Sequence, residues 1–223
     1  MKFGFNDYLR MWKKRGIRLP FSYFFQAHLF DLVHRKDTHM WLPKEKYIDS
    51  PKNFESGVLY MSSWTNTIKL STNKAVNLLS LNPKNTAFID IGCGKGKVLC
   101  MWNKMFPKAK HIIGIDYSPQ LIEICEKNLH QTSKLKVELI CADVTEIELE
   151  FNCEVFLFYL FNPFDSKILN KFLKKISNKK AVIIYNNPIH KTTIVDNGFN
   201  EHFDKESWHP NASFAIFSNI NLT

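Results

Sequence analysis

The chain has 223 residues, of which 45% are hydrophobic and 23% charged, a composition that fits a globular protein with a sizeable core and excludes general disorder. Its 30 Lys and Arg against 21 Asp and Glu give a net charge of +9, which favours an acidic partner or serves solubility alone. No nucleic-acid-binding signature accompanies the charge. Five cysteines without a C-x-x-C pair favour free thiols in a reducing compartment over a disulfide framework or a zinc site.

The N-terminal part, residues 1–80, is basic and rich in aromatic residues, with Pro20, Pro43 and Pro51 as interruptions. It starts without the apolar core of a signal peptide, and no apolar run of the chain reaches transmembrane length. We therefore expect a cytoplasmic protein without a membrane span. Because no alternation of strands and helices is visible before residue 81, we expect residues 1–80 to form a mainly helical or irregular extension that packs on a core of residues 81–223 as a lid.

From residue 81 onwards, short apolar runs alternate with stretches of helical spacing. The apolar runs predict buried strands at 86–92, 111–116, 136–143, 154–161 and 180–188. Helices are predicted at 97–106, from Ser118-Pro119 to about His130, and at 165–177 with Asp165 or Ser166 as the cap. A short helical piece to Gly198 and an antiparallel pair over 199–207 and 213–220 close the chain at the edge of the sheet. The pattern predicts an α/β fold with a doubly wound, mostly parallel seven-stranded sheet and an antiparallel C-terminal strand.

The first strand runs into FIDIGCGKGK (88–97), a glycine-rich turn before a helix. Glycines at such a turn let the backbone approach a ligand closely at a helix N-terminus. The nucleoside-triphosphate loop, G-x-x-x-x-G-K-[ST], is not matched, because Gly or Val follows each Lys. The dinucleotide pattern G-x-G-x-x-G, which a nicotinamide oxidoreductase needs, is broken, because Lys97 stands at its third glycine position. We expect Lys95 and Lys97 to be solvated or to cap a neighbouring helix.

The pattern that remains is an acidic residue two positions before G-x-G-x-G, and it resembles the first motif of the class I S-adenosylmethionine (SAM)-dependent methyltransferases. Asp116 ends the second strand, where this family binds the ribose, and Asp143 follows the third, where the family contacts the adenine. Asn162-Pro163-Phe164 ends the fourth strand, on the substrate side. The resemblance covers roughly residues 81–220 and implies a Rossmann-like methyltransferase fold, with SAM as cofactor and S-adenosylhomocysteine as product.

The resemblance implies a set of cofactor-binding residues at the strand ends: Asp90, Gly92, Cys93, Gly94, Gly96, Asp116, Tyr117, Asp143, Val144 and Asn162. A carboxylate at 116 can accept two hydrogen bonds from a ribose diol, and a cationic sulfonium favours a negative or carbonyl-lined site. A structural interpretation stays open for two of these residues: Asp116 starts a turn, and Asp143 caps the chain after the third strand.

The acceptor side offers three catalytic candidates, Asn162, Phe164 and Tyr60. Methyltransferases that act on amino nitrogens use [Asn/Asp]-Pro-Pro-[Tyr/Phe] at this strand end, and the chain has one proline fewer, which shifts the aromatic residue by one position. Tyr60 either closes over the site or only packs the extension onto the sheet. Methyl transfer needs alignment and sometimes a base, so no triad or metal is expected, and no histidine pair has convincing metal spacing.

The N-terminal extension makes the family resemblance more specific. HLFDLVHRKDTHMWLP and GVLYMSSWTNTIKL look like segments of bacterial methyltransferase-like proteins of uncharacterised substrate, with Phe30, Asp31, Asp37 and Thr38 matching in the first and Tyr60 in the second. Asp31 is either a partner of Arg35 or an acid of the active site. The hypothesis is a SAM-dependent methyltransferase with an unassigned acceptor. As acceptor, a nitrogen on protein or nucleic acid is slightly favoured over a small molecule. The alternatives are a catalytically inactive SAM-binding protein and an NAD-dependent oxidoreductase.

Overall fold

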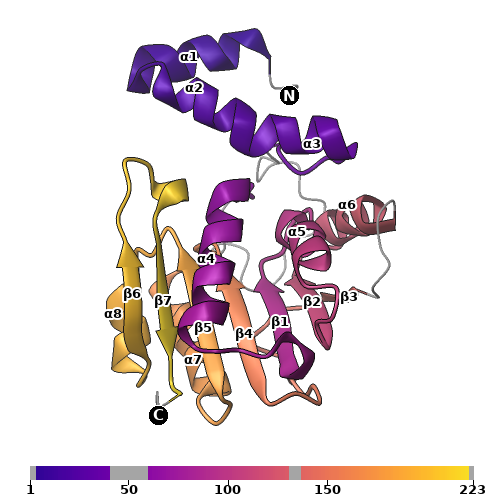
Figure 1. Ribbon diagram of the computed structural model, residues 1–223, viewed down its shortest axis with the longest axis vertical. Helices are drawn as coiled ribbons and strands as arrows, with labels where there is room; N and C mark the ends of the chain where they lie inside the picture. The colour runs from indigo at the N-terminus through magenta and orange to yellow at the C-terminus, as the bar shows by residue number, and fades with distance from the viewer. Residues whose placement is uncertain (1–3, 41–59, 131–136, 221–223) are drawn as a thin grey trace.

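The computed structural model describes residues 4–40, 60–130 and 137–220, and its core is a seven-stranded sheet in the order β3-β2-β1-β4-β5-β7-β6 (Figure 1). Every predicted strand is present, with bounds that differ from the predicted ones by only a few residues. The strands are β1 (Thr86–Ile91), β2 (His111–Asp116), β3 (Glu138–Cys141), β4 (Val155–Leu160), β5 (Ala181–Asn186), β6 (Asn200–Lys205) and β7 (Phe214–Ser218).

Strands β1 to β5 pair in parallel, and β7 is antiparallel to both of its neighbours, β5 and β6. The predicted fold class is therefore confirmed. The closing pair lies at one end of the sheet, with β6 outermost and β7 inside, where all five of its residues are buried. In the register of the central strands, Asp90 of β1 lies opposite Gly114 of β2 and Tyr159 of β4, so the carboxyl ends of the three strands meet at one edge.

Helices cover the sheet on both faces, as Figure 1 shows. On one face lie α4 (Thr65–Leu78), α5 (Lys97–Met105) and α6 (Pro119–His130). On the other lie α7 (Ser166–Ile176) and α8 (Lys191–Asp196). Short 3-10 turns occupy Pro83–Asn85 and Pro210–Ala212. The predicted caps are confirmed, because Asp165 accepts a hydrogen bond from the Ile168 N–H (2.9 Å) and the Ser118 hydroxyl accepts one from the Leu121 N–H (3.3 Å).

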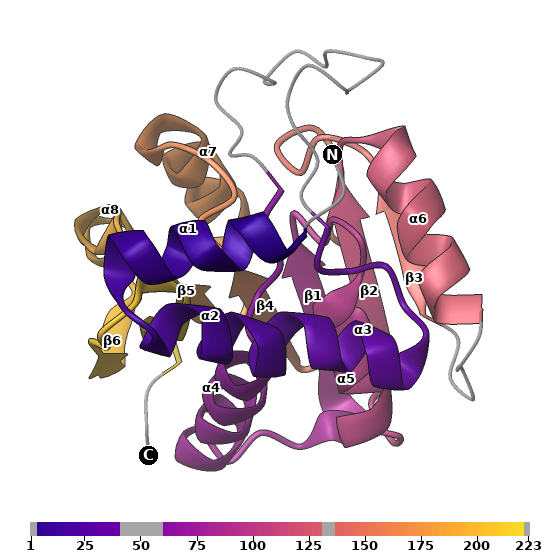
Figure 2. The same ribbon diagram turned by 90° about the horizontal axis from the view of Figure 1, so that it is seen from above.

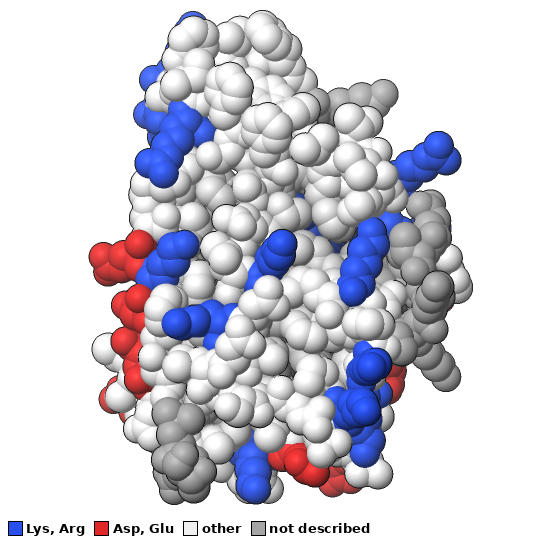
Figure 3. Space-filling view, viewed as in Figure 1, with Lys and Arg blue, Asp and Glu red and all other residues white. Residues whose placement is uncertain are grey.

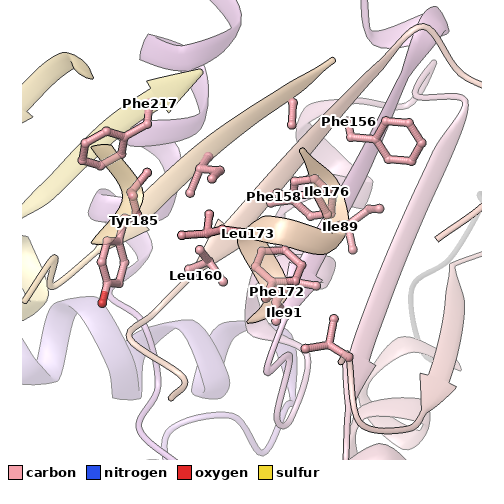
Figure 4. Close-up of a cluster of buried hydrophobic side chains, with 14 of the residues drawn as sticks. Ile89, Ile91, Phe156, Phe158, Leu160, Phe172, Leu173, Ile176, Tyr185 and Phe217 are labelled. Carbon is pink, nitrogen blue, oxygen red and sulfur yellow. The ribbon is translucent and has the colours of Figure 1, made fainter. Parts of the chain in front are cut away.

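The core follows the period-two alternation of the strands. Ile89 and Ile91 of β1 face α7, where Phe158 and Phe172 pack edge to face with ring centroids 5.3 Å apart (Figure 4). Phe88, which directly precedes Ile89, points to the other face and contacts Trp102 of α5. Apolar side chains on both faces explain why β1 and β4 read as uninterrupted apolar runs in the sequence.

The N-terminal segment forms α1 (Phe5–Arg15), α2 (Arg18–Tyr23), a π-helical turn (Phe24–His28) and α3 (Leu29–His34). Figures 1 and 2 show these helices lying across the carboxyl-end edge of the sheet. Helix α4, which also precedes residue 80, packs on the sheet through the buried Ile68 and Ala75. The predicted boundary at residue 80 stays a prediction. Within the described ranges, no helix is long and apolar enough to cross a membrane.

Candidate cofactor and acceptor site

A cavity lies at the carboxyl ends of β1, β2 and β4, the edge at which ligands bind in open α/β sheets. Most of the residues that the sequence singled out line it together: Tyr60, Asp90, Gly92, Cys93, Asp116, Tyr117, Asp143, Val144, Asn162 and Phe164. Gly94 and Gly96 do not line it. The sequence therefore located the cavity, and the roles of its residues toward a ligand stay predictions.

Gly94 and Gly96 serve the packing of the loop. Both have positive φ, +52° and +81°. A Cβ at Gly94 would lie 2.2 Å from the ring of Tyr60, and one at Gly96 would lie 2.4 Å from Cys125 Sγ. Since a side chain at either position meets a neighbour in a backbone conformation that favours glycine, the loop needs glycine there for close approach of other parts of the chain.

Asp116, at the end of β2, fixes this loop. Its two carboxylate oxygens accept hydrogen bonds from the backbone N–H groups of Gly94 (2.8 Å) and Ser118 (2.9 Å). Burial raises the pKa of Asp116 to about 6, although the backbone hydrogen bonds act in the opposite direction. A carboxylate oxygen accepts more than one hydrogen bond, so both oxygens keep capacity for ligand hydroxyls. Asp116 therefore starts a turn, as the alternative interpretation proposes. The ribose contact is compatible with this turn and stays a prediction.

Asp90, at the end of β1, is 3% exposed and lines the same cavity. Burial, and then the negative charge of Asp116, raise the pKa of Asp90 well above its usual range. Two carboxyl groups in one buried site favour the neutral form of at least one of them, and a cation placed between them reverses that preference. These two carboxyl groups therefore suit a positively charged ligand.

Asp143 begins a turn after β3, where its Oδ1 accepts hydrogen bonds from the backbone N–H (2.9 Å) and the hydroxyl (2.8 Å) of Thr145. The capping interpretation of Asp143 is thus observed, and the residue also lines the cavity together with Val144. The two interpretations left open by the sequence are compatible here.

Asn162, after β4, is buried and adopts a left-handed conformation, with φ of +44°. Its Oδ1 accepts a hydrogen bond from the Tyr185 hydroxyl at 2.8 Å. Pro163 lies under the glycine loop, because a Cβ at Gly92 would be 2.9 Å from Pro163 Cβ. The tyrosine holds the Asn162 amide in one orientation, and the amide oxygen retains a second lone pair toward the cavity.

Tyr60 joins the N-terminal segment to the glycine loop. Its ring lies against Gly94, and its hydroxyl donates a hydrogen bond to the Thr38 carbonyl at 2.5 Å. Lys95 reinforces this junction, since its Nζ lies 3.0 Å from the Asp37 carboxylate. Lys95 is 3% exposed and pairs with the Asp37 side chain, so the expectation that it is solvated or caps a neighbouring helix is wrong.

Asp31 is a buried acid of the N-terminal segment, 4% exposed. It accepts hydrogen bonds from the Thr38 hydroxyl (2.5 Å) and the His39 ring (2.6 Å), and from the backbone N–H groups of both residues. Burial alone raises the pKa of Asp31, but these hydrogen bonds outweigh it and hold the pKa below its usual value. Its partners are therefore Thr38 and His39 and not Arg35, and Asp31 does not line the cavity, so neither of the two interpretations of Asp31 is observed.

Lys97 is a cavity residue that the sequence did not assign to the site. It is 2% exposed, lines the cavity and donates a hydrogen bond from Nζ to the Gln26 carbonyl at 2.6 Å. Burial lowers its pKa to about 7, against the opposing effect of Asp31. The expectation of a solvated Lys97 is wrong, because the N-terminal helices cover this side chain. No local sequence pattern indicates this contact.

Comparisons with known proteins agree with this geometry. A family model described as a methyltransferase domain matches residues 88–179. A malonyl-[acyl-carrier protein] O-methyltransferase of Priestia megaterium is 32% identical over 101 residues, which are 44% of this chain and 35% of that protein. A carboxy-S-adenosyl-L-methionine synthase of Shewanella loihica is 35% identical over 68 residues, 30% of this chain and 28% of that protein. The chain thus spans about a third of the length of the curated relatives it matches.

A solved structure shares the fold. The SAM-bound amino pentose methyltransferase of Micromonospora echinaspora superposes with a TM-score of 0.50 and 10% identity, over 69% of this chain and 92% of that one. The family match starts in β1 and ends just before β5, so it includes the glycine loop and the ends of the four strands that surround the cavity. Motif, strand order and family model agree that residues 88–179 are similar to a methyltransferase domain.

Proposed function

We propose that this protein transfers the methyl group of SAM to an acceptor that enters the cavity beside Asn162 and Tyr60. The observation that carries the proposal is the convergence of Asp90, Asp116 and Asn162, from the ends of β1, β2 and β4, on one cavity next to the glycine loop. This cavity lies at the edge where open α/β sheets bind their ligands.

In the proposed complex, Asp116 accepts hydrogen bonds from the ribose hydroxyls, and Asp143 and Val144 border the adenine. Asp90 faces the positively charged methionine end, where a cation stabilises its ionised form. The cavity lining supports these positions, since all four residues border one space. Gly94 and Gly96 act indirectly, by keeping the loop close to Tyr60 and Cys125.

SAM supplies a methyl group that is already activated, so the protein has to align the acceptor and exclude water. Asn162 is suited to alignment, because the Tyr185 hydroxyl fixes its amide and one lone pair of Oδ1 remains. Tyr60 and Phe164 border the same space and supply apolar surface for a planar acceptor. Lys97, with a pKa of about 7, is a group of this cavity that can take up a proton near neutral pH.

The acceptor class that we place first is a nitrogen on protein or nucleic acid. The Asn162 amide oxygen can accept a hydrogen bond from an acceptor N–H, and the net charge of +9 suits an acidic partner. Figure 3 shows Lys and Arg spread over the viewed face, while Asp and Glu gather at its edges. The alternatives are a small-molecule acceptor and a SAM-binding protein without turnover.

We also propose that the N-terminal segment is a lid of the cavity. Tyr60 lines the cavity and its hydroxyl bonds to Thr38, while Lys97 in the lining is held by Gln26. Gln26 and Thr38 therefore contact two residues of the cavity wall. In this proposal the sheet core begins before α4, because α4 already packs on β5 and β7.

The test is formation of S-adenosylhomocysteine from SAM labelled in the methyl group. Purified protein is incubated with cell lysate that is untreated, nuclease-treated, protease-treated or reduced to its small-molecule fraction. Label recovered in the protein or nucleic-acid fraction supports the first acceptor class, and label in the small-molecule fraction supports the alternative. Tight SAM binding by calorimetry without turnover in any fraction would identify a binding protein, and absence of SAM binding would contradict the proposal altogether.

A further inference from the structure

A second cavity lies between the N-terminal helices and the β6–β7 end of the sheet, where α2 passes over the start of α4 (Figures 1 and 2). Its wall is formed by Arg18 and Gln26 from the N-terminal helices, by Trp64 at the start of α4, and by Lys205 and Trp208 after β6. None of these residues lines the cofactor cavity. The two cavities are neighbours, because Ser62 and Ser63, which line the first, directly precede Trp64.

The charged lining of this second cavity is entirely cationic. Arg18 and Lys205 line it, and no Asp or Glu is among its described lining residues. Neither cation has a carboxylate within ion-pair distance in the described part of the chain. The Arg18 guanidinium carbon lies 4.4 Å from the centroid of the Trp208 ring. A guanidinium stacked on a ring in this way keeps its in-plane N–H groups free for an oxyanion.

Two uncharged hydrogen-bond donors, on Trp64 and Gln26, belong to residues of the same lining. Trp64 is 4% exposed, and its indole N–H has no hydrogen-bond partner among the described residues. The Gln26 side-chain oxygen already accepts bonds from the Thr65 hydroxyl (2.9 Å) and the Asn66 N–H (2.8 Å), which leaves the Gln26 amide nitrogen as a donor. A buried donor that lacks an acceptor is costly, and a bound oxyanion would satisfy it.

The positive charge of Arg15 reaches this region. Burial, and then that charge, lower the pKa of His209, whose ring stacks on Trp64 with centroids 4.8 Å apart, so His209 itself favours its neutral form. The N-terminus of α4, with its partial positive charge, ends at the same wall. An anion entering this cavity therefore meets only favourable charges from its lining and donors in need of acceptors.

We propose that this second cavity binds a small molecule through an oxyanion, either a phosphate or a carboxylate. Arg18 is the principal contact, Lys205 a second charge, and Trp64 and Gln26 neutral donors. A ligand bound here lies beside the cofactor cavity, and the chain segment with Ser62 and Ser63 separates the two cavities. The proposal stands independently of methyl transfer, since it rests on binding alone.

The experiment is titration calorimetry of the full chain with phenyl phosphate, inorganic phosphate and benzoate at low ionic strength. Saturable binding of a phosphate probe identifies phosphate as the ligand group, and binding of benzoate alone identifies a carboxylate. Arg18→Gln should weaken the observed binding by about tenfold, as expected for loss of a charge-assisted pair. Lys205→Gln should weaken it by a smaller factor, because Lys205 acts as a point charge.

The matched control is Lys167→Gln on the exposed side of α7, far from the cavity, which removes the same charge. Its affinity for the probe should equal that of the unchanged protein. Lack of saturable binding by all three probes would overturn the proposal, and so would an equal loss in Lys167→Gln and Lys205→Gln, which would mean unspecific attraction. SAM affinity measured on Lys205→Gln should be unchanged, which shows that the variant is folded.

Discussion

Protonation of Asp116, the proposed ribose contact with a pKa of about 6, is expected by itself to weaken SAM binding about tenfold when the pH falls from 7 to 5. The burial that raises this pKa disfavours the ionised carboxyl, and a cationic cofactor favours it. The pKa in the free protein is higher than in the complex under this proposal. Proton release therefore accompanies binding, and the affinity rises with pH through the pKa of the free protein.

The magnitude follows from the fraction of protein that carries the ionised group. If SAM binds only when Asp116 is ionised, the dissociation constant is multiplied by 1 + 10^(pKa − pH). With a pKa of about 6, this factor is about 11 at pH 5, about 2 at pH 6 and about 1.1 at pH 7. Most of the change that is due to Asp116 should therefore occur below about pH 6, and little of it above pH 7.

Lys97 borders the same cavity, and its pKa of about 7 gives a second titration of the same sign. As the pH falls, Lys97 gains a positive charge that repels a cationic ligand. Its effect is centred about one pH unit higher than that of Asp116. Lys97→Met removes this titration and should leave the steep region below pH 6 in place.

The assay is calorimetric titration with SAM at about pH 5, 6 and 7 for the unchanged protein, Lys97→Met and Asp116→Asn. At pH 7, Asp116→Asn should lose about 1–3 kcal/mol of binding free energy, as for a lost hydrogen bond to a charged group. The dependence below pH 6 should disappear in this variant. An equally steep dependence in Asp116→Asn, with the fold intact by circular dichroism, would refute both the ribose role and the electrostatic reasoning.

Three further changes test the site and the core. Gly94→Ala should lose about 2–5 kcal/mol of unfolding free energy in urea, because a positive φ and a clash with the Tyr60 ring add up. Gly198→Ala, with φ of +84° and open space, should lose only about 1–2 kcal/mol, and an equal loss in both would exclude the clash. Asn162→Ala should keep SAM binding and lose turnover; loss of SAM binding would move Asn162 to the cofactor side. Phe172→Ala should cost about 3–5 kcal/mol in urea, and a loss near zero would contradict its place in the core.

The fold was accessible from the sequence because its signals are local. Val155 to Phe161 read as one apolar run because β4 is covered on both faces, and Ile89 and Phe88 of β1 point to opposite faces of the same sheet. Asp165 predicts the start of α7, because a capping side chain and the backbone N–H that it binds are only three residues apart. Each of these patterns is complete within a few residues, so composition and spacing reveal it.

The cavity residues at the strand ends were accessible for a related reason. Parallel strands bring their carboxyl ends to one edge, so Asp90, Asp116 and Asn162 meet although they lie far apart in the chain. The same rule does not predict the roles of Gly94 and Gly96. Their φ values and neighbours show that glycine at these positions serves loop packing, a distinction that a motif alone does not make.

What the sequence could not reveal depends on the N-terminal helices crossing the sheet edge. Lys97 looked solvated because its partner, the Gln26 carbonyl, is 71 residues away and has no side-chain signature. The sequence was as compatible with a packing role for Tyr60 as with a catalytic one. In the structure Tyr60 packs between the extension and the glycine loop and also lines the cavity, and its catalytic role stays a prediction. Its ring lies on Gly94 and its hydroxyl on Thr38. Side chains whose environment is made by distant backbone leave no periodic or spaced pattern to read.

The contacts around Gly94 connect the extension to the proposed cofactor acid. Asp31 fixes Thr38, the Thr38 carbonyl holds the Tyr60 hydroxyl, and the Tyr60 ring covers Gly94. The Gly94 N–H in turn donates to Asp116. Because each step is a direct contact between buried or half-buried groups, the position of the N-terminal segment and the shape of the glycine loop depend on each other. The motif around Asp31 and Thr38 therefore has a physical reason to accompany the glycine motif, although neither residue lines the cavity.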